Sequence, residues 1–171
     1  MKKINNQKGF TLIELLIVIA LLGALAVGLL AAVDPFEQLK KGRDTSTRNT
    51  AAEFYGASIR YYAQRSRFAW DETTTPLATG TVTSLNNLTE AISLMADAGE
   101  LKEDFVELAG TGNLSRISLY YETSQKLVVC FQPESKSFRN DANTKYNQFG
   151  VVQPTSVCPD PNSTSCYYCF K

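Results

Sequence analysis

Four cysteines carry the most reactive side chains of the sequence, and all of them lie in its last third: Cys130, Cys158, Cys166 and Cys169. The last two form a C-x-x-C pair, which in a cytosolic protein suits a redox site or one half of a zinc site. The chain contains no histidine, so the commonest metal ligand and the commonest general acid or base are absent. Outside the cytoplasm the same cysteines would indicate structural disulfides, so the compartment decides their role.

A lone carboxylate inside an apolar segment is the second notable group. Glu14 is followed by nineteen uncharged residues, 15–33, and preceded by the uncharged stretch 10–13. As a helix, residues 10–33 would span about 36 Å, which exceeds the roughly 30 Å of a bilayer's hydrocarbon core. An acid in such a helix costs about 2.5–3.5 kcal/mol at mid-bilayer and less near the edge, so its presence indicates a function.

The charges around the apolar segment predict its orientation. Three lysines precede it, while the charges directly after it balance: Lys2, Lys3 and Lys8, then Asp34, Glu37 and Asp44 against Lys40, Lys41 and Arg43. The positive-inside rule therefore keeps the amino terminus in the cytoplasm and places the rest of the chain outside. Two simpler interpretations are a secretory signal cut after residues 24–26 and a plain membrane anchor. The first would have an overlong apolar region containing an acid, and the second leaves Glu14 unexplained.

Residues 8–20 read Lys-Gly-Phe-Thr-Leu-Ile-Glu and then Leu-Leu-Ile-Val-Ile-Ala. This stretch resembles the processing site and anchor helix of type IV pilins and of the pseudopilins of type II secretion. The resemblance implies that a prepilin peptidase cuts between Gly9 and Phe10 on the cytoplasmic side and that the new Phe10 amine is N-methylated. It also implies that the mature subunit waits in the inner membrane and then polymerises into an extracellular filament at the cell surface.

A physical role for Glu14 in such a filament follows from its surroundings. If mature helices bundle in a filament core, the Glu14 carboxylate becomes buried, and a buried charge persists only when it is paired. Cleavage creates a cation, the Phe10 amine, and a pair between neighbouring subunits would fix their axial register. The pair would explain why cleavage must precede assembly, because no amine exists at Phe10 before the cut. The alternative is that Glu14 only reaches the lipid headgroups.

Three helix-weakening residues lie within or just after the apolar segment. Gly23 and Gly28 fall inside it, and Pro35 follows it. Glycine costs about 1 kcal/mol in a helix, while proline removes a backbone donor and kinks or breaks the path. We therefore predict bending or local melting here, and the resemblance implies that a comparable stretch loses helicity in assembled filaments. Pro35 stands a few residues later than the proline of that family.

Beyond Pro35 the pattern is amphipathic, with one stripe spaced by four and three residues: Arg48, Ala52, Tyr55, Ile59 and Tyr62. We expect this stripe to lie against a sheet. A continuous, kinked helix to residue 65 is favoured over a separate surface helix that starts after a hinge at residues 34–35.

The remaining sequence predicts a small α+β head. Residues 66–83 read as a polar loop, and Ser84 and Gly99 suit the two ends of a short helix. The stretches 117–121 and 127–131 read as an antiparallel hairpin, with a third strand near 149–152. The predicted fold is thus pilin-like: a leader at 1–9, a transmembrane half-helix at 10–33, an amphipathic half at 34–65, and a head at 66–171 that packs a small antiparallel sheet on the helix.

With the head outside the cytoplasm, structural disulfides are the preferred role of the cysteines, and three pairings are possible. Bridges that tie the carboxy-terminal loop to Cys130, or that close the loop from Cys158 to Cys166 or Cys169, are favoured without a choice between them. Loop carboxylates such as Asp141 and Asp160 could ligate calcium, but their spacing matches no recognised calcium loop. We therefore expect no metal and no cofactor.

The leading functional hypothesis is a structural pilin, not an enzyme. Its expected partners are other pilin subunits, the prepilin peptidase, the pilus or secretion assembly machinery and inner-membrane lipids. A net charge of zero gives no reason to expect a nucleic-acid partner. The first alternative is a pseudopilin of type II secretion. The second is a membrane-tethered extracytoplasmic enzyme, which would need a nucleophile–base pair that no local spacing indicates.

Overall fold

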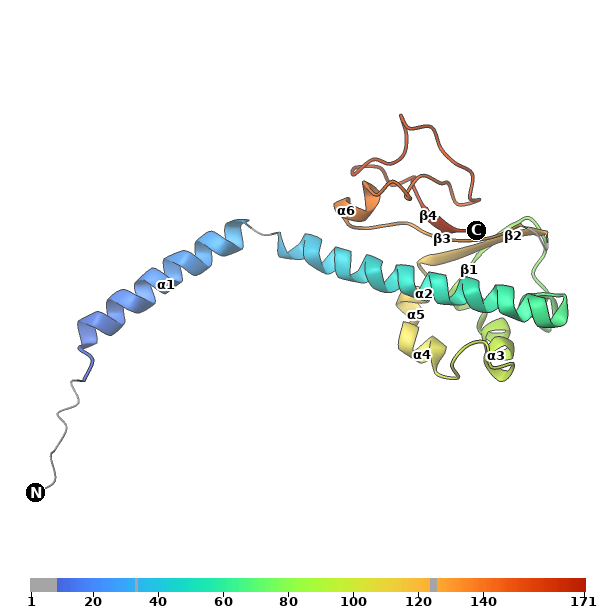
Figure 1. Cartoon of the computed structure of the whole chain (residues 1–171), viewed down its shortest axis with the longest axis horizontal. Helices are drawn as coiled ribbons and strands as arrows, with labels where there is room; N and C mark the ends of the chain where they lie inside the picture. Colours follow the sequence, from blue (N-terminus) through green and yellow to red (C-terminus); the bar gives the residue numbers. More distant parts are fainter. Residues whose placement is uncertain (1–8, 33, 124–125) are drawn as a thin grey trace, which may run out of the picture. The chain divides into compact units, whose positions relative to one another are not determined.

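The computed structural model describes residues 9–32, 34–123 and 126–171, so the predicted leader lies outside it except for Gly9. The chain divides into two compact units whose boundary falls between Phe36 and Glu37. The first unit contains α1 (Leu12–Ala32), one unbroken helix in Figure 1. Its residues Leu12–Leu30 are long and apolar enough to cross a membrane. This matches the predicted apolar half-helix.

The second unit is an α+β head that contains all but the first two residues of α2 (Pro35–Arg65). Proline suits the first helical position because its missing N–H needs no partner there, and Asp34 Oδ1 accepts a hydrogen bond from the Phe36 amide at 3.1 Å. Asp34 lies outside both helices, and α2 begins at the proline for which the sequence predicted a kink or break. Val33 lies outside the described residues.

The buried face of α2 differs from the predicted stripe by one residue. The residues that contact the core include Thr47, Ala51, Phe54, Ser58 and Tyr61, one position before each predicted residue. One residue corresponds to a rotation of about 100° around the helix. The predicted stripe lies beside the most buried face: Tyr55 and Tyr62 pack against the core while partly buried, whereas Ile59 stays 41% exposed.

The sheet has four antiparallel strands in the order β1-β2-β3-β4: Thr81–Ser84, Ile117–Thr123, Lys126–Phe131 and Tyr168–Phe170. The predicted hairpin is β2–β3, with Leu119 opposite Val129. The predicted strand near 149–152 was wrong, because only Val152 forms an isolated bridge, to Tyr146. The sheet's last strand is instead β4, which pairs with β3 and carries Cys169.

The predicted polar loop 66–83 is partly ordered structure. It contains the 3-10 helix η1 (Ala69–Asp71), whose Trp70 is fully buried, and most of β1. The following 3-10 turn η2 (Leu85–Asn87) leads into α3 (Thr89–Asp97), so Ser84 ends a strand and does not cap that helix. Gly99, with a φ of 77°, ends α3 as predicted, since a left-handed residue favours glycine.

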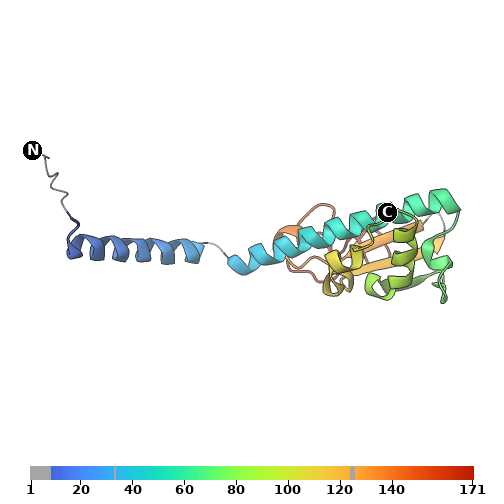
Figure 2. The same cartoon turned by 90° about the horizontal axis from the view of Figure 1, so that it is seen from below.

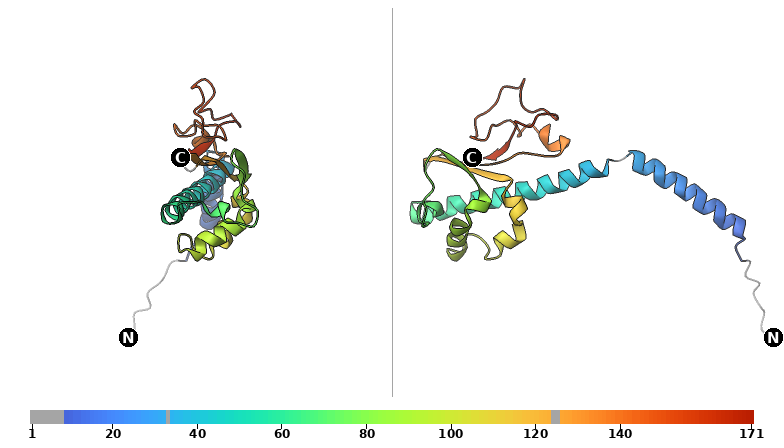
Figure 3. Two further views of the ribbon diagram at one scale, coloured as in Figure 1. Left: turned by 90° about the vertical axis from the view of Figure 1, so that its right-hand side faces the viewer. Right: turned by 180° about the vertical axis from the view of Figure 1, so that it is seen from behind.

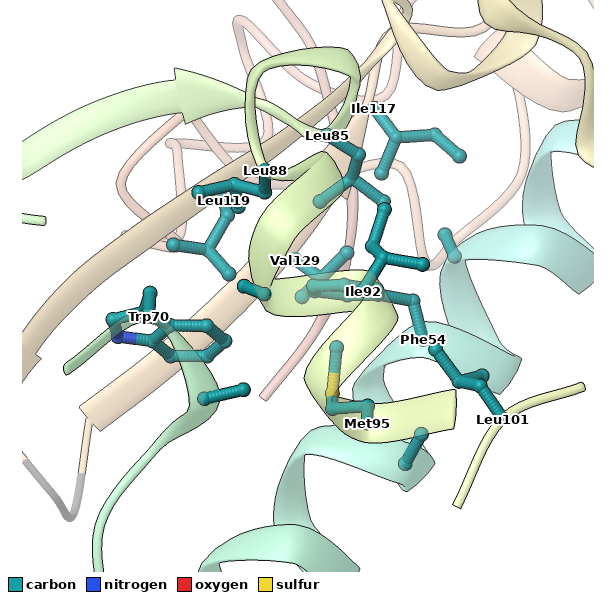
Figure 4. Close-up of a cluster of buried hydrophobic side chains, with 14 of the residues drawn as sticks. Phe54, Trp70, Leu85, Leu88, Ile92, Met95, Leu101, Ile117, Leu119 and Val129 are labelled. Atoms are coloured by element: carbon teal, nitrogen blue, oxygen red, sulfur yellow. The ribbon is translucent and has the colours of Figure 1, made fainter. Parts of the chain in front are cut away.

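The core of the head lies between α2, α3 and the sheet. Figure 2 shows α2, α3 and α4 (Phe105–Ala109) gathered along the strands. In the close-up of Figure 4, Phe54 of α2, Met95 of α3 and Leu119 and Val129 of the sheet turn toward one another, and each is fully buried. Two shorter helices, α5 (Thr111–Leu114) and α6 (Lys136–Arg139), complete the head.

Candidate functional site

The amino-terminal segment holds the residues predicted to act in processing and assembly. Gly9, Phe10 and Thr11 precede α1 in non-helical backbone. Phe10 is 87% exposed, and no atom of its own compact unit would contact a Cβ added to Gly9. Among the described residues of this unit, no helix hydrogen bonding and no packing covers the Gly9–Phe10 peptide bond, so this part of the chain leaves the bond open to an enzyme.

Glu14 closes the first turn of α1 through a capping box with Thr11. Its Oε2 atom accepts hydrogen bonds from the Thr11 amide at 2.8 Å and from the Thr11 hydroxyl at 2.7 Å, and the Glu14 amide donates to that hydroxyl at 3.3 Å. Such reciprocal bonds satisfy donors at a helix start. This capping role was not predicted from the sequence, although Thr-Leu-Ile-Glu fits the capping-box pattern. Within the described ranges no cation forms an ion pair with Glu14.

The three residues predicted to add flexibility occupy different places. α1 is helical through Gly23 and Gly28, and Pro35 lies at the start of α2. No atom would contact a Cβ added to either glycine in the single subunit. Bending or melting at the two glycines stays a prediction for the assembled state.

Two disulfides use all four cysteines, and they separate the C-x-x-C pair. Cys130 bonds to Cys169 across β3 and β4, where the two residues lie opposite one another. Cys158 bonds to Cys166 and closes a short loop. The two cysteines of the C-x-x-C thus belong to different bridges. Among the residues that the structure describes, no group of three or more cysteine, aspartate or glutamate side chains could hold a metal ion.

Loss of the Cys130–Cys169 bridge is expected to destabilise the head more than loss of the Cys158–Cys166 bridge. Their sequence separations are 39 and 8 residues. Loop-closure entropy then gives about 4 kcal/mol for the first bridge and about 2.5 kcal/mol for the second. Urea unfolding of the full chain in detergent would compare the two double Cys→Ser variants. An equal loss, or the reverse order, would contradict the entropic account.

The carboxylate of Asp44 joins α2 to the segment before α6, and its burial was not predicted from the sequence. Asp44, counted there among balanced surface charges, is fully buried. Its carboxylate accepts hydrogen bonds from the Glu134 amide at 3.0 Å, from the Ser135 amide and hydroxyl at 2.7 Å each, and from Arg116 Nη2 at 3.1 Å. The prediction failed because burial of a single charge depends on partners about 70 and 90 residues away. No local pattern could have indicated it.

In the described chain, the Gly9–Phe10 pair precedes a helix of membrane-spanning length, and the following compact unit is an α+β head with a four-stranded sheet. Residues 4–30 match the family model described as the prokaryotic N-terminal methylation motif. This is the prepilin-type cleavage motif of type IV pilins and pseudopilins, so the resemblance drawn from the sequence is confirmed. Comparisons with curated proteins and with solved structures gave no match. The motif supports a type IV pilin-like or pseudopilin protein that a prepilin peptidase processes.

Proposed function

We propose that this chain is a structural pilin of a type IV pilus-like extracytoplasmic filament. The observation that carries the proposal is the exposed Gly9–Phe10 bond placed directly before α1. The large apolar side chains of α1 are 47–80% exposed in the single subunit. Such a surface requires lipid before assembly and other apolar helices after it, because exposed apolar area of this extent is unfavourable in water.

In the proposed pathway each segment of the chain has one role. The peptidase removes residues 1–9, and residues 10–33 hold the mature subunit in the inner membrane with its amino terminus in the cytoplasm. Residues 34–65 link this anchor to the head at 66–171. Polymerisation by the pilus machinery then transfers the subunit from the membrane lipids to a cell-surface filament of other copies.

The Phe10 amine and Glu14 would join neighbouring subunits. Within the part of the chain that the structure describes, the hydrogen bonds of the Glu14 carboxylate go to Thr11 and occupy one of its two oxygens. The other oxygen is left for a cation supplied by another copy. An intermolecular pair of this kind removes the cost of burying Glu14 among apolar helices and fixes the axial position of one subunit against the next.

A pilus is favoured over the short filament of a secretion pseudopilin by the carboxy-terminal region. Two disulfides hold this region, and its acids serve its own turns: Asp141 Oδ1 accepts from the Asn143 amide at 2.8 Å and Asp160 Oδ1 from the Asn162 amide at 2.9 Å. A covalently pinned terminal loop suits an exposed filament surface. Long filaments sheared from cells that produce this chain are the expected product.

Intact-mass and amino-terminal analysis of the native protein is the direct test of the proposal. We expect a chain that starts at Phe10, carries one added methyl group and is lighter by four hydrogens because of two disulfides. A mature chain that begins beyond residue 32 would contradict the retained anchor.

Replacement of Gly9 with valine is expected to block processing completely. A β-branched side chain at the residue before the cut would crowd the peptidase, whereas Gly9 now offers an open backbone. The matched control is Gly23→Val, because Gly23 also has open space but lies inside α1. Mass spectrometry of membrane fractions should find only the uncut chain for Gly9→Val and the normal mature chain for the control. Normal trimming of Gly9→Val would refute the cleavage site.

A further inference from the structure

A groove with an apolar floor and a basic rim runs along one flank of α2. It encloses about 320 Å³ between α2, the start of β3 and the loop around Gly150, and we call it the lysine groove; its main lining residues are Tyr55, Ile59, Lys126, Phe149, Val151 and Lys171. Ile59, Phe149 and Val151 are 41%, 38% and 52% exposed. These three are large apolar side chains that the head leaves in contact with solvent.

The lysine groove is held in shape by close packing of its loop. Gly150 has a φ of 72°, and a Cβ there would lie 2.7 Å from Val128 Cγ1 of β3. The loop therefore approaches the strand as closely as a glycine allows. The groove is thus present before any partner arrives, which lowers the ordering cost of binding.

The rim of the groove carries two lysine side chains, Lys126 and Lys171. Lys171 Nζ lies 4.7 Å from the centre of the Tyr146 ring, and no carboxylate in the described part of the chain forms an ion pair with it. Lys126 pairs with Glu122, and the hydrogen bond between them raises the pKa of Lys126, so this amine is charged at neutral pH. Two lysine ammonium groups thus border the apolar floor: that of Lys126 has Glu122 as a partner within the head, and that of Lys171 lies over the Tyr146 ring.

The complementary surface lies on the other flank of α2, at α4. Leu108 is 66% exposed, and its amide bonds to the Asp104 carbonyl at 2.9 Å, so these two residues lie one turn apart. Glu103, Asp104 and Glu107 are exposed around it, and within residues 9–32, 34–123 and 126–171 none of the three forms an ion pair. Lys102 beside them leaves a net charge of two negative. We call Glu103, Asp104, Glu107 and Leu108 the acidic knob.

Helix periodicity places the groove and the knob on opposite sides of α2. Tyr55 and Ile59 are one turn apart on one flank, whereas Thr50 and Glu53 line a pocket with Leu108 on the other flank. The core-facing stripe of α2 lies between these two flanks. Figures 1 and 3 show α4 and the carboxyl end of the chain on opposite sides of α2.

We propose that the lysine groove of one head receives the acidic knob of a second copy of this chain. Leu108 would cover the apolar floor between Ile59 and Phe149, and Asp104 and Glu107 would face Lys126 and Lys171. The two surfaces are different and lie on opposite flanks, so the contact is heterologous and repeats from copy to copy, as a filament requires. This inference rests on the proposed filament function and names a head-to-head surface that is separate from the apolar helices.

Zero-length carbodiimide cross-linking of unmodified filaments tests the contact. Filaments would be formed from the full chain with equal parts ¹⁴N- and ¹⁵N-labelled subunits, and cross-linked peptides would be read by mass spectrometry. We expect mixed-isotope links from Lys126 or Lys171 to Asp104 or Glu107, which detergent-solubilised monomers do not give. Filaments that form without these links would overturn the proposed contact but not the proposed filament function. Links from Lys171 to a different protein would assign the groove to another partner and would also overturn the contact. If the unmodified chain forms no filaments, the proposed function falls and this contact with it.

Charge reversal adds a test with matched controls. Glu107→Lys and Lys171→Glu are each expected to lower the yield of sheared filaments by about tenfold, because like charges would meet across the contact. The double variant should recover most of the yield. Asp97→Lys on α3 and Lys136→Glu on α6 reverse exposed charges that belong to neither surface and should assemble normally. Normal yield from Glu107→Lys, or no recovery in the double variant, would overturn the proposal.

Discussion

Replacement of Glu14 with glutamine or alanine should leave processing intact and nearly abolish filaments. Each buried Phe10 amine would lose its counter-charge, and breaking a buried pair costs about 3–5 kcal/mol, which corresponds to a loss of assembly of about a hundredfold or more. Glutamine keeps an oxygen that can accept the Thr11 hydrogen bonds, so its effect isolates the charge. Intact mass of the membrane-bound subunit and the quantity of sheared filaments would be measured on the same cells.

Thr11→Ala is the matched control for the Glu14 variants. It removes the hydroxyl half of the capping box but keeps the carboxylate of Glu14. Loss of a cap costs about 1 kcal/mol, so we expect filaments at a moderately reduced yield. Glu14→Gln filaments at the unmodified yield would refute the pairing role. An equal loss in both variants would instead assign Glu14 to helix capping.

Replacement of Asp44 with alanine should destabilise the head by about 3–5 kcal/mol, because it leaves Arg116 and the amides of Glu134 and Ser135 without their shared acceptor. That is a large part of the stability of a domain of this size. Asp44→Asn should lose less, since one amide oxygen still accepts. The segment before α6 would detach from α2 first, because Asp44 is the acceptor for both of its amides.

The single tryptophan of the chain, Trp70, makes this measurement direct. It is fully buried in the core of the head and stacks on Phe68 with ring centres 4.6 Å apart, so its fluorescence reports the packing of the head. Urea unfolding of the full chain in detergent would be followed at this residue. Asp97→Ala removes an exposed acid of α3 and should change stability by less than about 0.5 kcal/mol. An Asp44→Ala midpoint equal to that of the control would rule out a structural role for the carboxylate.

The hydrogen bonds of Asp44 with Arg116, Glu134 and Ser135 also affect assembly. Asp44 lies on α2 near the start of the head, and through Ser135 it holds the segment that leads into α6. Arg43 on the same turn pairs with Glu134 at 2.6 Å. Force applied to α2 in a filament would therefore reach the head through charged hydrogen bonds as well as through the apolar core. Filaments of Asp44→Asn should break under milder shear than filaments of the unmodified chain.

The sequence by itself determined the parts of this protein that depend on local composition. An apolar run of spanning length predicts α1, because in lipid each backbone group must be satisfied within its own helix. The Gly9–Phe10 motif and the lone Glu14 stand beside that run and need no distant residue to be recognised. Two short stretches rich in β-branched and aromatic residues, separated by polar residues, likewise predicted the β2–β3 hairpin, since its strands are neighbours in the chain.

Only the tertiary structure decided the features that depend on residues far apart in the chain. The face of α2 that is buried follows from its packing in the core cluster of the head, and periodicity alone placed that face one residue away. The partner of Cys130 follows from β4 pairing with β3, which brings Cys169 opposite to it across 39 residues. Asp44 became a buried acceptor because the fold brought Arg116 and Ser135 to it. Burial, pairing and desolvation are properties of the packed chain, so no local sequence pattern could predict them.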